Sequence, residues 1–314
     1  MQPDRSPGSA PASPIPAFVN PLSGSADEAS RTLERAGGFE LRLVPPDQLC
    51  EQIAATVAQG VDRILVAGGD GTIEAAASVL IGTPVALAVL PGGTLNHFAR
   101  DHGIPTDPDE ALAVARTGQV RMVDVGYVND QLFINTSSVG AYVLFVRWRD
   151  HIERYFGYRF ASVLAGIRVL LRLRRMPAVV EGGGEVRHYR TPLVFVGVGE
   201  RQLTLASLGQ RVPGGARGLH VILVRGRRFA RRFARAYSRI TRGLPVQERG
   251  IGLDSALVEH FQLDLPGRRA HVATDGEIVL TNTPLAYRYV PDALRVVVPG
   301  DAAGGYARSA GDAR

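Results

Sequence analysis

The chain has 314 residues, of which 45% are hydrophobic, so it is long enough for two ordinary domains with packed cores. Its formal net charge is +6, from 36 basic and 30 acidic residues, and every basic residue is an arginine. A lysine base, Schiff base or phosphate anchor is therefore excluded. The single cysteine, Cys50, excludes an internal disulfide and a cysteine-rich zinc site, and it favours a reducing compartment.

No segment of the sequence has the pattern of a secretion signal or a membrane span. The first residues, MQPDRSPGSAPASP, lack the apolar core of a signal peptide, and no apolar run reaches the ~20 residues of a transmembrane helix. We therefore expect a cytoplasmic protein whose contact with a membrane is at most peripheral, on the inner face. Residues 1–14 and 300–314, rich in Gly, Ala, Ser and Pro, are expected to be disordered tails.

Residues 15–124 alternate short apolar runs with helical patterns. Strands are expected at 16–19, 41–44, 63–67 and 85–90, and helices at 46–59 and from about residues 26, 72, 94 and 109. This repeated order predicts a doubly wound α/β domain, with a parallel sheet covered on both faces.

Closely spaced strand patterns dominate the rest of the chain. They begin with MVDVGYV and QLFINTSSVG, which are separated by a turn at Asn129-Asp130, and continue at 178–198, 219–225, 257–265, 269–281 and 285–298. We expect a mostly antiparallel domain over residues 125–287, interrupted by helical insertions at about 146–175 and 227–243. Residues 288–299, which cover most of the last of these strand patterns, are expected to lie outside this domain.

Two glycine-rich turns each join a predicted strand to a predicted helix. One is Gly68-Gly69-Asp70-Gly71-Thr72 and the other is Pro91-Gly92-Gly93-Thr94. Both should lie at the carboxyl edge of the sheet, where ligands bind in open parallel sheets. Glycines allow positive φ and expose backbone N–H groups, and helix N-termini favour anions, so the pair predicts a phosphate site. Each turn alone could equally serve helix-on-strand packing.

Two further turns offer candidate residues and have structural alternatives. The turn Asn20-Pro21-Leu22-Ser23-Gly24-Ser25 can contact a nucleotide, or can simply precede a helix. Asp275 and Glu277 are two carboxylates two residues apart, one of which can accept a proton from a hydroxyl nucleophile. The alternative for HVAT-DG-EIVL is a β-hairpin with a tight Asp-Gly turn.

Residues 225–243 combine arginines with an aromatic stripe at helical spacing. Such a helix can lie on an anionic membrane surface, or it can bury its stripe against the second domain. No nucleic-acid recognition module accompanies the basic charge, so we expect no nucleic acid partner. The sequence is compatible with a homodimer.

The ordered motifs NPLSG, VAGGDGT, LAVLPGGTLNHFARDHGIP, VDVG, FINTSSVGAY, ATDGE and PLAYRYVPDALRVVVP resemble the diacylglycerol kinase catalytic family. This family includes bacterial soluble lipid kinases and relatives of sphingosine and ceramide kinases, and it is related more distantly to NAD kinase. The resemblance implies an N-terminal α/β domain, a C-terminal β-sandwich with the last strand returning to the first domain, and Mg-ATP as phosphoryl donor to a lipid hydroxyl.

The resemblance also assigns roles by position. It implies that Glu277 accepts the proton of the lipid hydroxyl, that Asp275 is its partner carboxylate, and that Asp70 acts through magnesium. The nucleotide-binding residues that it implies are Asn20, Pro21, Ser23, Gly24, Gly68, Gly69, Asp70, Gly71, Thr72, Gly92, Gly93, Thr94 and Asn96.

The chain departs from the family pattern at three places. His97 stands where many relatives have Asp, and FVGVGERQL lacks an Asn that is common there. Many relatives also bind a structural magnesium with an acidic cluster, but the matching stretch Gly214–His220 has no carboxylate, so we predict that this metal site is absent.

The leading expectation is an ATP- and Mg²⁺-dependent kinase of diacylglycerol or a related lipid alcohol, working at a membrane surface. The alternatives are a kinase of a soluble hydroxyl substrate, like NAD kinase, and a nucleotide- or phospholipid-binding protein that has lost turnover.

Overall fold

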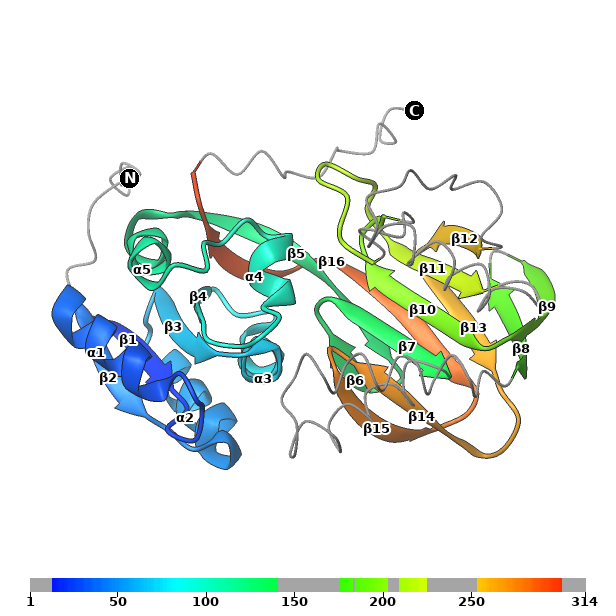
Figure 1. Ribbon diagram of the computed structural model, residues 1–314, viewed down its shortest axis with the longest axis horizontal. Coiled ribbons are helices and arrows are strands. Elements are labelled where there is room, and N and C mark those ends of the chain that lie inside the picture. Colours follow the sequence, from blue (N-terminus) through cyan, green and yellow to red (C-terminus); the bar gives the residue numbers. More distant parts are fainter. Residues whose placement is uncertain (1–12, 141–174, 183, 203–208, 225–252, 301–314) are drawn as a thin grey trace, which may run out of the picture. The chain divides into compact units, whose positions relative to one another are not determined.

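The computed structural model describes residues 13–140, 175–182, 184–202, 209–224 and 253–300. The helical insertions expected at 146–175 and 227–243, and the expected tails, lie almost entirely outside these residues. The chain divides into two compact units (Figure 1). Unit 1 contains the residues up to Val123 together with Asp292–Gly305, and unit 2 contains Asp124–Pro291. The expected boundaries were 124/125 and 287/288.

Unit 1 is built on a parallel sheet with the strand order β2-β1-β3-β4-β16. Its strands are β1 (Ile15–Val19), β2 (Phe39–Leu43), β3 (Arg63–Gly68), β4 (Ala86–Pro91) and the end of β16 (Leu285–Val298). Its helices are α1 (Ala26–Ala36), α2 (Pro46–Ala58), α3 (Asp70–Leu80), α4 (His97–Asp101) and α5 (Pro108–Thr117). The last strand thus returns to the first sheet, as expected.

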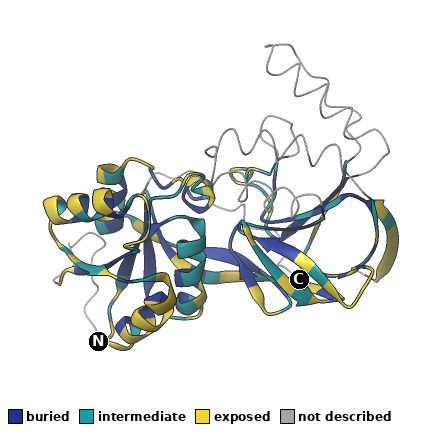
Figure 2. Cartoon of the chain, turned by 60° about the horizontal axis from the view of Figure 1, so that its bottom comes forward, coloured by how far each residue is buried: buried dark blue, intermediate teal, exposed yellow. Residues whose placement is uncertain are grey.

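Helices cover both faces of this sheet. Alternate residues of β1, β3 and β4 form one core with the apolar sides of α1 and α5, which include Leu33 and Leu112. Ile53 of α2 and Leu80 of α3 are also fully buried. Figure 2 shows these strands in the dark blue of buried residues and the outer sides of the helices in the yellow of exposed ones. The predicted doubly wound α/β domain is confirmed.

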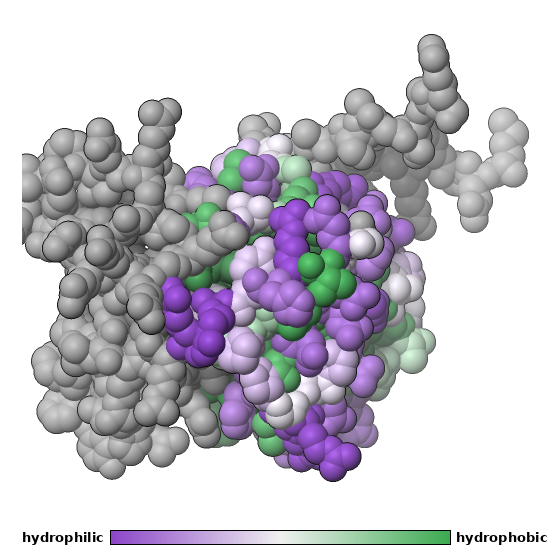
Figure 3. All heavy atoms as spheres, turned by 90° about the vertical axis from the view of Figure 1, so that its right-hand side faces the viewer, coloured by the Kyte–Doolittle hydropathy of each residue, from purple (hydrophilic) through white to green (hydrophobic). Residues whose placement is uncertain are grey.

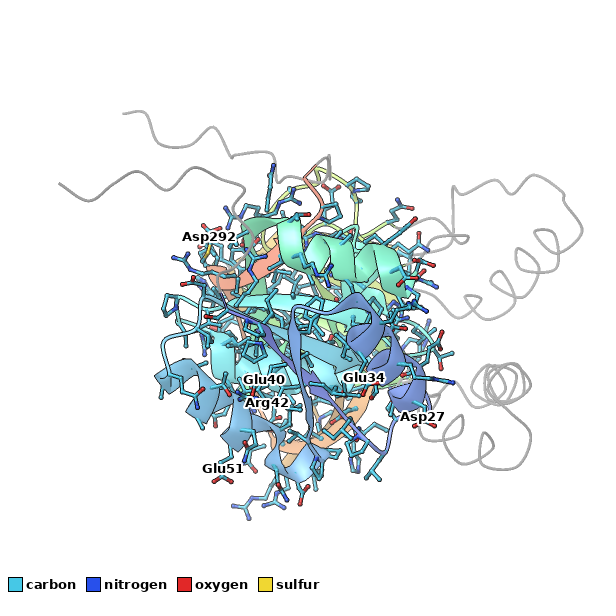
Figure 4. The ribbon with its side chains drawn as sticks, turned by 90° about the vertical axis from the view of Figure 1, so that its left-hand side faces the viewer. Asp27, Glu34, Glu40, Arg42, Glu51 and Asp292 are labelled. Carbon is cyan, nitrogen blue, oxygen red and sulfur yellow. The ribbon has the colours of Figure 1, made fainter. Side chains whose placement is uncertain are left out.

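Charged residues occupy the outer surface of unit 1. Glu40 and Arg42 form an ion pair along β2, with 2.9 Å between Oε1 and Nη2, and Figure 4 shows their side chains next to each other. Arg42 also donates from Nη1 to the Thr56 hydroxyl of α2 at 2.7 Å. Edge strand β2 therefore presents charge to solvent, which disfavours pairing with another chain.

Three helices of unit 1 begin at other residues than expected. Helix α3 starts at Asp70 instead of Thr72, with Gly69 at the N-cap and no side-chain cap. Helix α4 starts at His97 instead of Thr94, because Asn96 is left-handed at φ 49° and ends the preceding turn. Helix α5 starts at Pro108, where the Asp107 carboxylate accepts the N–H of Glu110 at 3.0 Å.

Unit 2 consists of two antiparallel layers of strands. One sheet has the order β12-β11-β10-β7-β14-β15, and the other layer contains β16-β13-β8-β9 with the β5–β6 hairpin. The strands are β5 (Gln119–Val128), β6 (Gln131–Phe133), β7 (Thr136–Gly140), β8 (Met176–Gly182), β9 (Glu185–Thr191), β10 (Leu193–Val198), β11 (Leu219–Val224), β12 (Leu253–Val258), β13 (His260–Asp264), β14 (Arg269–Thr274) and β15 (Glu277–Asn282).

The two layers of unit 2 share one hydrophobic core, which confirms the predicted C-terminal sandwich. Tyr287 of β16 is at its centre, with its ring stacked on that of Phe261 at 4.6 Å between centroids. The Tyr287 hydroxyl hydrogen-bonds the Ser137 hydroxyl of the opposite sheet at 3.1 Å. Burial raises the pKa of the Tyr287 phenol, so the ring stays neutral and links the two layers.

The predicted strand over 131–140 is interrupted. Strand β6 ends at Phe133 and β7 begins at Thr136, and between them the backbone N–H groups of Ile134, Asn135 and Thr136 are bonded to the Asp275 carboxylate. The Asp275 side chain, which is remote in sequence, thus replaces strand partners at this break. The local sequence pattern gives no sign of this contact.

Candidate active site

The three turns of unit 1 that were predicted to bind a nucleotide meet at one edge of its sheet. The N–H of Gly92 donates to the carbonyl of Gly68 at 2.9 Å, which joins the turn after β4 to the turn after β3. The Ser25 hydroxyl donates to the carbonyl of Gly92 at 2.9 Å, which joins the turn after β1 to both. The expected convergence at the carboxyl ends of the strands is therefore present.

The glycines of these turns are required by close packing. None of Gly68, Gly69, Gly92 and Gly93 is in the left-handed region, so the expectation of positive φ is wrong for them. Instead, a Cβ on Gly93 would lie 2.7 Å from the Cα of Gly69. A Cβ on Gly68 would lie 2.8 Å from the side chain of Thr72. Only residues without a side chain allow these backbones to approach so closely.

Gly24 differs from the other turn glycines, because a Cβ there would meet nothing within 4 Å. Its turn is held by local bonds, with the Asn20 side-chain oxygen accepting the N–H of Leu22 at 2.9 Å. The hydroxyls of Ser23 and Ser25 lie 3.0 Å apart. Ser25 ended the predicted turn but was not assigned a role, and its hydroxyl bonds Gly92 and does not cap α1.

Asp70 joins the first glycine turn to the start of α4. Its Oδ2 accepts the N–H of His97 and its Oδ1 accepts the N–H of Phe98, both at 3.1 Å. The side-chain oxygen of Asn96 accepts the N–H of Gly93 at 2.8 Å. The carboxylate thus stabilises α4, and each oxygen keeps a lone pair for a water molecule.

Backbone N–H groups at the start of α3 suit an anion. The first intrahelical bond there runs from the N–H of Ile73 to the carbonyl of Gly69. The N–H groups of Asp70, Gly71 and Thr72 therefore precede the first intrahelical bond, at the positive end of an 11-residue helix. Together with the neighbouring turns they can hold a phosphate without a lysine.

The candidate carboxylates of unit 2 lie on the β14–β15 hairpin. Asp275 and Gly276 have φ of 47° and 97°, so the alternative of a tight Asp-Gly hairpin turn is correct. The Asp275 carboxylate accepts N–H groups of Ile134, Asn135 and Thr136 at 2.6–2.9 Å. Asp275 therefore joins the hairpin to the β6–β7 connection.

Glu277 has a different environment from Asp275. It is the first residue of β15, opposite Thr274, and its side chain is exposed to solvent. The two carboxylates of the hairpin therefore differ, since Asp275 is bonded to backbone N–H groups and Glu277 is exposed to solvent. The structure brings Asp275 and Glu277 together in unit 2, and the glycine turns and Asp70 together in unit 1.

A cavity of about 880 Å³ lies in unit 2, between β8, β9 and β13 on one side and β11 and β12 on the other. Its wall includes Val180, Tyr189, Val221, Leu223 and Phe261. The polar side chains of Glu185, Arg187, His188 and Asp254 line it as well. Figure 3 views the end of unit 2 that β8, β9 and β12 form, where apolar residues in green lie among hydrophilic ones in purple.

Comparison with known proteins gives the family. Residues 14–128 match the model of the diacylglycerol kinase catalytic domain. A diacylglycerol kinase of Mycobacterium tuberculosis is 28% identical over 311 residues, which cover 91% of this chain and 95% of the relative. Residues 14–128 thus carry the diacylglycerol kinase catalytic domain, the domain of a lipid kinase family. This domain implies the use of ATP.

Two further proteins are similar to the chain. A probable lipid kinase of the YegS-like type from Pseudomonas putida is 32% identical over 151 residues, 47% of this chain and 50% of that protein. The crystal structure of a diacylglycerol kinase from Bacillus anthracis superposes with a TM-score of 0.66 at 20% identity, covering 92% of this chain and 98% of the other. That likeness shows the fold.

The described residues do not form a metal centre of their own. No group of three or more His, Cys, Asp or Glu side chains is placed to hold a metal ion among the residues that the structure describes. His97, which replaces the Asp of many family members, is exposed and contributes its backbone N–H to Asp70. The action of Asp70 through magnesium stays a prediction.

Proposed function

We propose that the chain transfers the γ-phosphoryl group of Mg-ATP to the hydroxyl group of a lipid alcohol such as diacylglycerol. The observation that carries the proposal is the joining of the three N-terminal turns around the start of α3, within a chain of a lipid kinase family. Phosphoryl transfer depends chiefly on positioning and charge stabilisation, and turns built from backbone N–H groups supply both.

The proposed step assigns one role to each group. The N–H groups of the turns hold the phosphate oxygens, and Glu277 accepts the proton of the lipid hydroxyl. The hydroxyl oxygen bonds the γ-phosphorus as the bond to the β,γ-bridging oxygen breaks, and ADP leaves. Magnesium, when bound with ATP, offsets the negative charge of the phosphates. Asp275 positions the Glu277 hairpin through its bonds to residues 134–136.

The cavity of unit 2 supports a lipid as acceptor. Its volume of about 880 Å³ lies within the range of ~300–1,000 Å³ that ligand pockets usually have. An apolar wall with charged residues at β9 and β12 suits a molecule that has acyl chains and a polar end. A soluble, highly polar acceptor would gain little from side chains such as Val221, Leu223 and Phe261.

We further propose that the chain meets its lipid as a cytoplasmic protein at the inner membrane face. Among the helices that the structure describes, none is long and apolar enough to cross a membrane. The arginine-rich segment 225–243, the proposed contact with anionic lipid, lies outside the described residues.

The direct test is transfer of labelled phosphate. Purified protein with Mg²⁺ and γ-labelled ATP is incubated with a total lipid extract in mixed micelles, or with NAD and no lipid. Label on a lipid that gains one phosphate supports the proposal. Label on NAD alone would instead indicate a kinase of a soluble substrate, and no label on either, beside an active control kinase, would contradict turnover.

Glu277→Gln tests the assigned base. The variant should lose ~10²–10⁴-fold in turnover because the lipid proton loses its acceptor, while ATP affinity stays unchanged. The measurements are steady-state transfer to lipid and ATP binding by calorimetry. The matched control is Glu51→Gln, an exposed residue of α2 in unit 1, which should change neither. Equal activity of both variants would show that Glu277 is not the base.

A further inference from the structure

Arg217 and Asp124 form an ion pair inside unit 2. The guanidinium donates from Nη2 to Oδ1 of Asp124 at 2.5 Å and from Nε to Oδ2 at 3.2 Å, so both carboxylate oxygens are engaged. The Asp124 side chain is 0% exposed and that of Arg217 is 27% exposed. A planar guanidinium fits a carboxylate in this two-point manner, whereas a lysine does not.

Tyr289 completes the cluster from another strand. Its hydroxyl accepts a bond from Arg217 Nε at 3.1 Å. Burial and a hydrogen bond to Asp124 raise the pKa of the Tyr289 phenol, so the hydroxyl keeps its proton. Asp124, on β5, is the first residue of unit 2. Tyr289, on β16, lies two residues before Pro291, at which β16 passes from unit 2 into unit 1. Arg217 therefore holds the two strands of unit 2 that continue into unit 1.

A buried carboxylate requires a positive partner. Removing one member of a buried pair leaves an uncompensated charge and is strongly destabilising. Arg217 lies in Gly214–His220, the stretch in which many family members have the acidic cluster of a structural magnesium. This stretch has no carboxylate, and Mg²⁺ and Ca²⁺ take six or more oxygen ligands. Asp124, whose two oxygens are already engaged by a guanidinium, therefore does not suit either ion.

We infer that Arg217 is a built-in cation for Asp124, which stabilises unit 2 in place of a bound divalent metal ion. The inference goes beyond the proposed function, since its consequence is a stability that needs neither nucleotide nor lipid. The positive charge is supplied by the chain itself, so the fold of unit 2 should be independent of magnesium and calcium.

Thermal unfolding of the full chain tests this inference. Wild-type protein should unfold at the same temperature in EDTA and in millimolar Mg²⁺ or Ca²⁺. Arg217→Ala should lower the midpoint by roughly 10 °C, because the buried Asp124 carboxylate loses the guanidinium that engages both of its oxygens. The control is Arg35→Ala. In the wild-type protein the Arg35 Nη2 also bonds both oxygens of a carboxylate, that of Asp109, but this ion pair is exposed. It should lower the midpoint by less than about 3 °C.

Chemical rescue separates a missing cation from a missing contact. Guanidinium chloride at low millimolar concentration should raise the midpoint of Arg217→Ala relative to equal NaCl, and should not raise that of wild-type protein. If Arg217→Ala does not fold, Asp124→Asn/Arg217→Ala should fold, since the buried charge is gone. The inference is overturned if wild-type protein loses stability in EDTA, if Arg217→Ala matches Arg35→Ala, or if neither guanidinium nor the double change restores stability.

Discussion

At the scale of single residues, Asp70 is a carboxylate in a turn suited to phosphate, where repulsion between like charges would be expected. Asp70 is the first residue of α3, but both of its oxygens accept backbone N–H groups of α4. Its negative charge is therefore directed to the start of α4 and away from the start of α3. The residue therefore has a structural task that does not depend on nucleotide, and a role through magnesium remains a prediction.

Asp70→Ala should destabilise unit 1 by about 1–3 kcal/mol, because two N–H groups lose a charged acceptor. Denaturant unfolding followed by circular dichroism measures this. Asp47→Ala, which removes an exposed carboxylate from the first turn of α2, is the control and should have a smaller effect.

Asp70→Asn then tests the magnesium role, since the amide keeps one acceptor oxygen and removes the charge. Affinity for ATP should fall with Mg²⁺ present and stay unchanged without it. Equal loss under both conditions would mean that Asp70 acts on the nucleotide site only through α4.

At the scale of elements, the β14–β15 hairpin is joined to the β6–β7 connection by one side chain. Sequence pattern predicted the hairpin from Asp275-Gly276, since a two-residue Asp-Gly turn tolerates positive φ. It did not predict that Asp275 faces residues 134–136, about 140 positions away. Contacts of this range depend on the fold and leave no local signal.

Asp275→Ala should cost at least about 2 kcal/mol of unfolding free energy, because three N–H groups lose a charged acceptor. Asp275→Asn should cost less, since Asn keeps one oxygen and tolerates the left-handed backbone. Asp264→Ala, at the exposed end of β13, is the matched control. The check is the order of denaturation midpoints, and a midpoint for Asp275→Ala as high as that of Asp264→Ala would refute the structural role.

The turns of unit 1 show the same division between local and long-range information. The glycines Gly68 and Gly93 predicted tight turns, and the alternation of strands and helices predicted that both turns lie at one edge of the sheet. The sequence suggested positive φ as the reason for glycine, but the structure gives backbone-to-backbone packing, with a Cβ on Gly93 only 2.7 Å from Gly69. A distance between two turns cannot be inferred from either turn alone.

At the scale of the whole molecule, unit 1 is discontinuous in sequence. Its sheet ends with the last part of β16, where Leu294, Val296, Val297 and Val298 are all fully buried. The family resemblance implied this return, and the fully buried run Val296–Val298 agrees with it. The segments 141–174 and 225–252 lie outside the described residues, so the predicted amphipathic helix stays a prediction.

Ending the chain after Pro291 should prevent unit 1 from folding and should leave unit 2 folded. The physical reason is that β4 keeps β3 but loses its other neighbouring strand, which pairs at Leu87, and the core loses four buried side chains. Nucleotide binding by calorimetry and amide dispersion by NMR report on the two units. A chain that ends after Gly300 is the control and should behave as the full chain, while ATP binding by the shorter chain would disprove the prediction.

The return of β16 also sets an order in time during synthesis. Strand β4 leaves the ribosome about 200 residues before the part of β16 that pairs with it, an interval of roughly 10–40 s at ~5–20 residues per second. Unit 2 is complete when Pro291 emerges, but the N-terminal sheet must wait with one edge unpaired until the last strand is made. Unit 1, whose first strands are made first, is therefore the last unit to finish folding, and during that wait its unpaired sheet edge is where a chaperone would be needed.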